Sequence, residues 1–371
     1  MNILFLIFHG LSSTSGISKK ILYQIDGLKA NGHRVLLCHY EIREDGHRVR
    51  MIDDAILQDY GKSILAPIRK RTEYNAVVHF ALQNGIDWVY IRSFHNANPF
   101  TIRMIRRLKK KGIPCVMEIP TYPYDQEYIT PFMKLELFVD KCFRKSLGRQ
   151  LQKIVTFSPS PTIFGVPTIR ISNGINFGDI PVKTHLNDTS RELHLLGVAE
   201  IHYWHAYDRL IKGMAGYYAG QPEYKVYFHL VGNFSGPREE EDILPLIRMH
   251  GLEPYVVFHG ALYGDSLTSL FQQCDLGIGS LGRHRSGITD IKTLKNREYA
   301  ARGIPFIYSE TDEDFEQMPY ILKISPDESP VSIPHLIRFY RSVSWTPVQI
   351  RNSIQNLSWT KQMEKVIREL D

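Results

Sequence analysis

The chain has 371 residues, of which 43% are hydrophobic and 23% are charged. This length predicts two domains with buried cores, and the composition excludes a disordered, collagen-like or fibrous protein. Four scattered cysteines without a C-x-x-C pair exclude a disulfide scaffold and indicate a reducing cytoplasm. No run approaches the roughly 18 apolar residues of a membrane span. The apolar residues 3–8 lack the basic flank and cleavage site of a signal peptide, so we expect a buried strand there.

The net charge of +6 is unevenly distributed along the chain. Residues 1–170 contain 25 Lys and Arg against 14 Asp and Glu, whereas the remainder contains 20 against 25. A basic half indicates an anionic partner such as a membrane surface, a lipid phosphate or nucleic acid. A solvated basic face without a partner accounts for the same charge equally well.

Short apolar runs alternate with amphipathic segments, which is typical of βαβ units and parallel sheets. In the first half we expect, in order, strand 3–8, helix 18–30, strand 34–39, strand 88–91, helix 101–111, strand 114–119 and a last strand 153–157. In the second half we expect strand 193–199, helix 207–219, strands 224–231, 256–259 and 276–278, helix 292–301 and strand 305–308. The turn-rich segment between them predicts domains 1–172 and 191–355, a linker 173–190 and a C-terminal segment 356–371 that contains a helix.

A loop from Gly10 to Gly16 joins the first expected strand to the first expected helix. At such a junction, backbone N–H groups and a helix N-terminus can hold a phosphate or a polar substrate. The spacing is neither that of a P-loop nor G-x-G-x-x-G, so a plain connecting loop is an equal alternative.

The most specific motif lies in the second half. Asp290 and Glu298 are separated by seven residues and followed by Tyr-Ala-Ala-Arg-Gly-Ile-Pro-Phe, up to Phe306. This block resembles the acid-x7-acid motif of retaining GT-B glycosyltransferases, in particular group 1, family 4-like enzymes of bacterial surface-polysaccharide synthesis. Weaker resemblances to the same family are found in residues 118–125, 171–175, 197–209 and 358–370. The alternative for the block is an ordinary amphipathic helix with solvated charges.

The resemblance implies roles for the residues of this block. Glu298 would hold the donor ribose and Asp290 the hydroxyls of the transferred sugar. The donor diphosphate would be bound by backbone N–H groups at a helix start and by nearby cations, a set comprising Thr293, Leu294, Lys295 and Arg285.

The chain departs from the family at one place. Many members carry an Arg and a Lys after the first strand of the second domain, where this chain has Glu200 and His205. Because a carboxylate repels a diphosphate, we expect Glu200 to point elsewhere and His202, His205, Arg283 or Arg285 to supply the charge. A structural or stacking role for the two histidines is the alternative.

The resemblance also implies acceptor-side residues in the first domain, namely Glu118 as a catalytic group, Tyr124, and Gly10, Ser15 and Gly16 of the loop. No metal site is expected, because His202-x-x-His205 is too closely spaced for a zinc pair. The sequence Asp312-Glu313-Asp314 is expected to be a solvated acidic loop, and the alternative is the Asp-x-Asp metal motif of a different glycosyltransferase fold. The basic residues 106–111 are expected to complement a helix dipole or to touch phosphates or lipid headgroups.

The predicted fold is α/β of the GT-B type, with two Rossmann-like doubly wound domains facing across a cleft and a C-terminal helix returning to the first domain. The predicted function is metal-independent retaining transfer of a hexose from a nucleotide-sugar, with UDP or GDP as the expected nucleotide, to a glycan or lipid-linked acceptor in bacterial envelope polysaccharide synthesis. No cofactor and no nucleic acid are expected. The predicted location is cytoplasmic, peripheral on the inner face of the cell membrane. The alternatives are a catalytically degenerate binding or scaffold subunit and a sugar-nucleotide epimerase or hydrolase.

Overall fold

The computed structural model describes residues 1–12, 15–93, 97–125, 128 and 130–370. Contacts divide the chain into two compact units of similar size. Unit 1 comprises Met1–Ser172 together with Trp359–Asp371, and unit 2 comprises Asn173–Ser358. Within the described ranges, none of the helices has the length and apolar character that a bilayer crossing requires.

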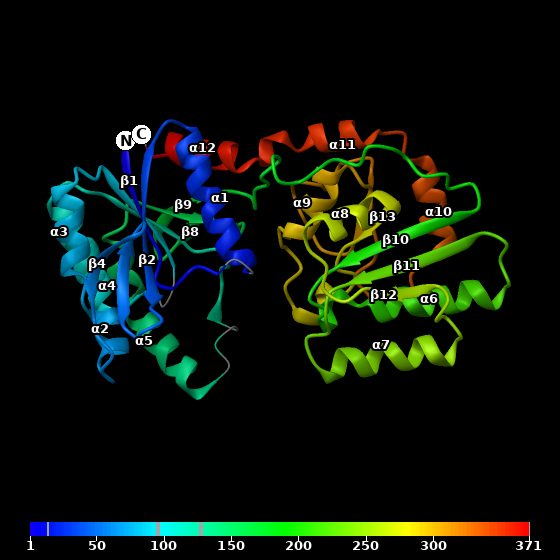
Figure 1. The fold of residues 1–371 in the computed structure, drawn as a ribbon, viewed down its shortest axis with the longest axis horizontal. Coiled ribbons are helices and arrows are strands. Elements are labelled where there is room, and N and C mark those ends of the chain that lie inside the picture. The colour runs from blue at the N-terminus through cyan, green and yellow to red at the C-terminus, as the bar shows by residue number, and fades with distance from the viewer. Residues whose placement is uncertain (13–14, 94–96, 126–127, 129, 371) are drawn as a thin grey trace. The chain divides into compact units, whose positions relative to one another are not determined.

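Unit 1 is built on a mainly parallel sheet with the strand order β4-β3-β2-β1-β5-β6-β7-β9-β8 (Figure 1). Its strands are β1 (Asn2–Leu6), β2 (Arg34–Ile42), β3 (Arg48–Ile52), β4 (Ala55–Asp59), β5 (Trp88–Arg92), β6 (Cys115–Glu118), β7 (Lys153–Thr156), β8 (Thr162–Ile163) and β9 (Val166–Arg170). Its helices are α1 (Gly16–Ala30), α2 (Ala66–Thr72), α3 (Asn75–Gln83), α4 (Pro99–Lys110), α5 (Pro131–Gly148) and α12 (Trp359–Arg368).

Strand β1 is apolar on both faces because helices cover both sides of a parallel sheet. Its side chains alternate between two hydrophobic cores. Leu4 and Leu6 belong to one core, and Ile3 and Phe5 belong to the other. The second core includes Trp359 of α12, which packs on α1 as Figure 1 shows at the top of this unit. The helices approach closely at Gly27, where a Cβ would lie 2.7 Å from the Trp359 carbonyl oxygen.

The expectation that residues 153–157 form the last strand of the first half is wrong, because β9 pairs with β7 and continues the sheet. Strands β3 and β4 also extend the sheet beyond β2, in antiparallel pairs. Strand β3 carries a charged residue inward, since Arg50 is 1% exposed and donates to the Tyr60 hydroxyl at 2.9 Å. That buried arginine obscures the alternation by which a strand is recognised.

Unit 2 contains a parallel sheet with the strand order β12-β11-β10-β13-β14-β15. Its strands are β10 (Glu192–Val198), β11 (Lys225–Val231), β12 (Val256–Phe258), β13 (Leu276–Ile278), β14 (Phe306–Tyr308) and β15 (Ile321–Lys323). Its helices are α6 (Tyr207–Ala219), α7 (Pro237–Met249), α8 (Gly264–Gln273), α9 (Leu294–Arg302), α10 (Ile333–Ser342) and α11 (Pro347–Ser353), with 3-10 turns η2 (Tyr203–His205), η3 (Arg283–Ser286) and η4 (Gln355–Leu357). Residues 173–190 contain neither a helix nor a strand.

Two cores cover the faces of this second sheet. Leu210 and Ile211 of α6 and Ile243 of α7 join inward residues of β10 and β11, which agrees with the position of α6 and α7 along one face in Figure 1. Phe271 of α8 and Tyr299 of α9 belong to the other core. Helix α9 ends at Gly303, whose φ of 79° is the left-handed conformation that favours glycine.

Both strand orders reverse at one point, which is where ligands bind in open parallel sheets. In unit 1 the chain proceeds from β1 to one side and later returns to β5 on the other side of β1. In unit 2 the equivalent reversal lies between β10 and β13. The loops that follow these four strands are therefore the places to look for functional residues.

Candidate functional site

The first turn of α9 lies beside the reversal point of the second sheet. Thr293 is the N-cap residue, and its side chain makes no capping hydrogen bond. The free backbone N–H groups of this turn and the positive end of the helix dipole favour an anion. Leu294 is 45% exposed, so the turn is open to solvent on that side.

Around this turn lies a cluster of buried polar atoms that have no hydrogen-bond partner within the described structure. The atoms are Thr293 Oγ1, Lys295 Nζ, Ser280 Oγ, Arg283 Nε and Glu310 Oε2. Leaving such groups buried and unpaired costs about 1–3 kcal/mol each. We call these five residues the α9 cluster. Their concentration at a helix N-terminus at the carboxyl end of a sheet is the arrangement of a ligand site that supplies the missing partners.

The positive charges of Lys295 and Arg283 in this cluster are only partly offset by the carboxylate of Glu310. Burial and the charge of Arg283 lower the pKa of Lys295 to about 7, although the carboxylate of Glu310 acts in the opposite direction. Burial raises the pKa of Glu310, which Arg283 and Lys295 only partly offset. Burial likewise lowers the pKa of Arg283. A bound anion would favour the charged forms of Lys295 and Arg283.

His205 is the residue of η2 that adjoins the cluster, and it is 4% exposed. Its Nδ1 accepts a hydrogen bond from the His202 backbone N–H at 2.9 Å, which leaves the ring proton on Nε2. Burial and the charges of Lys295 and Arg283 lower its pKa far below the ordinary value, so the ring is neutral. His205 therefore presents a neutral N–H donor rather than a positive charge.

His202 serves the same turn in another way, because its ring stacks on Trp204 with centroids 4.2 Å apart. The turn is joined to the loop after β13 by two backbone hydrogen bonds, from Leu281 to the His205 carbonyl at 3.0 Å and from Gly282 to the Trp204 carbonyl at 3.2 Å. A Cβ on Gly282 would lie 2.5 Å from that of Ala206, so this approach requires glycine.

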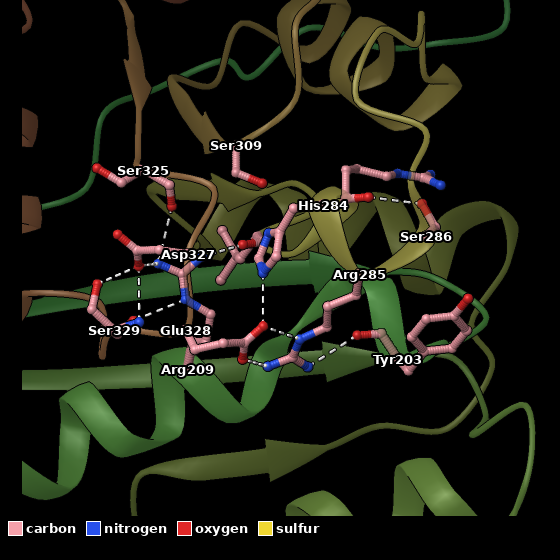
Figure 2. Close-up of polar contacts among 12 residues, drawn as sticks. Tyr203, Arg209, His284, Arg285, Ser286, Ser309, Ser325, Asp327, Glu328 and Ser329 are labelled. Carbon is pink, nitrogen blue, oxygen red and sulfur yellow. Dashed lines mark hydrogen bonds and ion pairs between the residues drawn. The ribbon is translucent and has the colours of Figure 1, made fainter.

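Arg285 of η3 is fully engaged by the carboxylates of Asp208 and Glu328, and Figure 2 shows its contact with Glu328. Its guanidinium donates to both oxygens of Asp208, at 2.8 and 3.0 Å, and to both oxygens of Glu328. His284 reaches the same Glu328 carboxylate at 2.7 Å. Figure 2 also shows Arg285 bonded to the Tyr203 carbonyl oxygen, at 3.1 Å. These contacts tie η3 to η2 and α6.

A second arginine holds the other side of the same loop. Arg209 is 2% exposed and donates to the carbonyl oxygens of Ser325 and Ser329 and to Asp327, as Figure 2 shows. It also donates to the carbonyl oxygen of Leu281. The loop that carries Arg283 is therefore fixed at one end by the hydrogen bond from Arg209 to the Leu281 carbonyl and at the other by the ion pairs of Arg285. Such support keeps a site in one geometry before a ligand arrives.

The expectation that residues 312–314 form a solvated acidic loop is wrong for Asp312 and Asp314, whereas Glu313 is exposed. Asp312 is fully buried and accepts from Arg297 of α9 at 2.7 Å, and Asp314 pairs with the same guanidinium. Lys292 lies 3.2 Å from Glu313. This ion-pair network anchors the first turns of α9 to the segment after β14.

The two acids of the seven-residue spacing occupy different environments. Asp290 is exposed and precedes α9, and it forms a parallel bridge with Thr311 rather than a helical turn. Glu298 lies in the second turn of α9, where one carboxylate oxygen accepts from Arg302 at 3.0 Å. Its side chain is 31% exposed, so it remains accessible to a ligand.

In unit 1, Glu118 lies at the end of β6 and is completely buried. Its carboxylate accepts from Gln24 and from Tyr90, each at 2.6 Å, and forms an ion pair with Arg92. Burial acts to raise the pKa of Glu118, but Arg92, Lys20 and these hydrogen bonds lower it overall. The carboxylate is thus ionised and satisfied by the protein itself.

The other acceptor-side residues fall into two groups. Tyr124 is 5% exposed and donates to Asp140 at 2.7 Å, which fixes α5 against the preceding loop. Ser15 caps α1 by accepting from the Ser18 N–H at 3.4 Å, while Gly10 and Gly16 are exposed. Ser13 and Thr14 of the same loop lie outside the described residues.

The structure thus brings together Thr293, Leu294, Lys295 and His205, with Glu298 one turn further along α9. It does not bring Arg285 to the cluster as an unengaged cation. Ser280 and Glu310, which follow β13 and β14 by two residues each, were not predicted from the sequence. Their position after parallel strands was the available signal, because the carboxyl ends of such strands form the ligand-binding edge.

No family model matches the chain, and no curated protein matches it by sequence. Solved structures do match its fold over its whole length. Sucrose-phosphate synthase from Thermosynechococcus elongatus has a TM-score of 0.64 at 16% identity, covering 100% of this chain and 98% of that one. A glycosyltransferase from Rickettsia africae has a TM-score of 0.64 at 14% identity, covering 100% and 97%. HepE of Anabaena, in complex with UDP, has a TM-score of 0.61 at 17% identity, covering 100% and 99%. The predicted fold class is confirmed: the chain has the α/β fold of GT-B glycosyltransferases.

Proposed function

We propose that this protein is a glycosyltransferase that moves a sugar from a nucleotide-sugar donor bound by unit 2. The observation that carries the proposal is the α9 cluster, in which buried donors and cations, together with the Glu310 carboxyl group, lie without hydrogen-bond partners around a helix N-terminus. A diphosphate satisfies the donors and cations of this set, because its oxygens accept from backbone N–H groups and from cations together, whereas Glu310 is itself an acceptor and is not a ligand of the diphosphate. The UDP complex of HepE, a protein of the same fold, supports this choice of ligand class.

The donor is held in the following way. The N–H groups of the first turn of α9, together with Lys295 and Arg283, bind the diphosphate. The Nε2–H of His205 donates to the same group, which replaces a charge with a neutral hydrogen bond. Glu298 accepts from the ribose hydroxyls, and Asp290 accepts from hydroxyls of the transferred sugar.

Arg285 acts as a positioning residue in this account. Its carboxylate partners leave it little capacity for a phosphate, but they hold η3 so that Arg283 stays near α9. Gly282 and the two backbone bonds to η2 hold His205 in the same way.

The reaction retains the anomeric configuration and needs no metal. The leaving diphosphate accepts the proton of the acceptor hydroxyl on the same face of the sugar, while Lys295, Arg283 and the N–H groups of α9 stabilise the charge that develops on it. The acceptor is a glycan or a lipid-linked saccharide bound by unit 1, as in bacterial envelope polysaccharide synthesis. The basic charge of residues 1–170 supports an anionic acceptor on the inner face of the membrane.

A thermal-shift panel with UDP, GDP, ADP, CMP and dTDP tests donor binding, because a ligand of the native state raises the melting temperature. One nucleotide at a hundredfold excess over its Kd is expected to raise it by about 5–10 °C. The matching nucleotide-sugar is then incubated with the protein and its slow hydrolysis is followed by proton NMR. Release of the sugar with the donor's own anomeric configuration is expected. A panel without any shift, or release of the inverted anomer, would contradict the proposal.

A catalytically inactive binding subunit is the second candidate. It is favoured by Glu200, an exposed carboxylate where related enzymes place a cation, and by the neutral state of His205. The same panel separates the two candidates. A melting shift without hydrolysis or transfer across a broad set of acceptors would favour the binding subunit.

A further inference from the structure

Unit 1 contains an apolar cavity of about 420 Å³ at the reversal point of its sheet. Phe8 follows β1, Ala97 follows β5, and both line it. This volume lies within the range of small-molecule sites. Open parallel sheets bind ligands at this position, so both the location and the shape of the cavity indicate a ligand-binding site.

The lining of the cavity is mainly hydrocarbon, although it also includes the carboxylates of Glu136 and of Asp140, the latter engaged by Tyr124 and Arg144. Tyr74 and Phe8 contribute rings in an edge-to-face arrangement, and Ile68, Phe100 and Leu135 contribute side chains that are 45–59% exposed. Large apolar side chains gathered in one open cavity on a protein surface mark a binding site.

The apolar character continues along α5 beyond the cavity. Phe132 and Phe138 lie three residues to either side of Leu135 and are 61% and 65% exposed. Residues at this spacing share one face of a helix. The occupant therefore has an apolar part long enough to follow the face of α5.

The rim of the cavity carries a cation without an acidic partner. Arg71 lies 3.5 Å from Glu136, but Lys70 has no ion pair within the described residues, and its Nζ lies 3.6 Å above the Tyr40 ring. Arg48 and Arg50 are close enough to act on Lys70, and in the described chain neither pairs with a carboxylate. One guanidinium nitrogen of the buried Arg50, Nη1, has no hydrogen-bond partner among the described residues, although the Cys38 thiol and the Tyr74 ring lie close to the same group.

Crowding of like charges beside a low-dielectric cavity is unfavourable unless an anion offsets it. In accordance, burial and the charges of Arg71, Arg50 and Arg48 lower the pKa of Lys70 to about 8. The occupant therefore carries a negative group next to its hydrocarbon part.

We propose that this cavity binds a lipid phosphate, with the hydrocarbon chain against Ile68, Phe100 and Leu135 and the phosphate at Lys70. The proposal rests on the proposed function only where it identifies this lipid as the anchor of the acceptor. It commits to a single lipid molecule in the cavity, rather than to adsorption of unit 1 on a charged bilayer.

The test uses the full-length protein with farnesyl phosphate, farnesol and inorganic phosphate as separate probes, each titrated by calorimetry. Farnesyl phosphate is expected to bind more tightly than either part alone. Leu135→Asp is expected to weaken it about tenfold. Lys70→Ala is expected to weaken farnesyl phosphate about fivefold and to leave farnesol unchanged.

Two control variants carry the same types of substitution at exposed positions outside the cavity. Leu82→Asp changes an exposed leucine of α3, and Lys110→Ala removes an exposed cation of α4. Neither residue lines the cavity, so both variants are expected to bind as the wild type does. Since Leu135 and Lys70 are not core residues, unchanged melting temperatures will show that the variants are folded.

Three outcomes would overturn the proposal. Farnesyl phosphate fails to bind, or it binds Leu135→Asp as well as it binds the wild type. Alternatively, the protein binds vesicles containing phosphatidylglycerol with no loss in either variant, which would indicate adsorption on a bilayer. If the protein binds farnesyl phosphate but no nucleotide, the lipid-phosphate site is supported and the proposed glycosyltransferase function is contradicted. If it binds a nucleotide but not farnesyl phosphate, only the lipid-phosphate site is contradicted.

Discussion

Lys295 and Glu310 face the same buried region from different elements of unit 2, and neither Lys295 Nζ nor Glu310 Oε2 has a hydrogen-bond partner in the described structure. The charges act on each other without forming an ion pair within 4 Å. In an ion pair that stabilises a fold, the two charged groups are usually in direct contact. Here the Lys295 amine is not engaged by Glu310 and remains accessible to a ligand at the N-terminus of α9.

Lys295→Met is expected to weaken binding of the donor nucleotide at least tenfold while the melting temperature stays equal to or above that of the wild type. The reason is that an unpaired buried ammonium group costs stability, whereas methionine fills similar space without a charge. Nucleotide titration and thermal melts of both proteins check this. A variant that melts lower and binds normally would assign Lys295 to structure rather than to binding.

Donor affinity is expected to fall as the pH rises above about 7, because the pKa of Lys295 in the free protein is about 7 and only the charged amine attracts a phosphate. Binding raises that pKa, so it takes up a proton above pH 7. Calorimetry in buffers of different ionisation enthalpy measures this uptake. Lys295→Arg, which stays charged, should bind with a flatter pH profile. Identical profiles for the two proteins would contradict the assignment.

Glu328→Gln separates two roles for Arg285 by the sign of its effect. If Arg285 positions η3, loss of the Glu328 charge loosens the loop and weakens nucleotide binding. If Arg285 itself bound the phosphate, release from its acidic partner would strengthen binding. We expect about a fivefold weakening, measured by nucleotide titration. A tighter complex would restore the phosphate role predicted from the sequence.

Asp312→Asn is expected to destabilise unit 2 by about 3 kcal/mol, because it leaves the buried guanidinium of Arg297 without its main charge partner. The melting temperature should fall by about 6–12 °C. Glu313→Gln, at the neighbouring half-exposed position, should change it by no more than about 1 °C. Equal melting temperatures for the two variants would show that the buried pair carries no special weight.

Glu118→Gln is expected to lower stability by about 3 kcal/mol at pH 7 and to leave turnover per folded molecule unchanged. The pKa of Glu118 is held below its ordinary value of 4.5, so its contribution is present above that pH and is lost as the pH falls through the lowered value. Urea titrations of the wild type and the variant at pH 7 and pH 4 measure the difference between their free energies of unfolding, which is expected to be smaller at pH 4. Loss of turnover with wild-type stability would instead support the catalytic role inferred from the resemblance.

Much of the fold was predictable where the hydrophobic pattern decides the structure. The expected bounds of α6 and β13 agree with the observed ones, and α9 begins two residues later than expected. In these segments the sequence has the apolar runs typical of buried strands and the periodicity typical of amphipathic helices. The antiparallel strands β3 and β4 were not predicted, because Arg50 is buried through a hydroxyl, a carbonyl and a ring rather than through apolar character.

The site was predictable only in its local part. Free N–H groups at a helix start depend on adjacent residues, so Thr293, Leu294 and Lys295 could be placed together from their order in the chain. The state of Arg285 could not, since Asp208 and Glu328 lie 77 and 43 residues away. Burial of Asp312 is equally non-local, because only folding brings Arg297 against it.

Calorimetric titration of the wild-type protein with uridine, UMP and UDP measures whether the α9 cluster binds a diphosphate. Guanosine, GMP and GDP form a parallel series. In one series we expect affinity to rise steeply with each phosphate, and we expect inorganic pyrophosphate to compete with the diphosphate. Equal affinity for nucleoside and diphosphate in both series, or no binding in either, would contradict diphosphate binding by the α9 cluster.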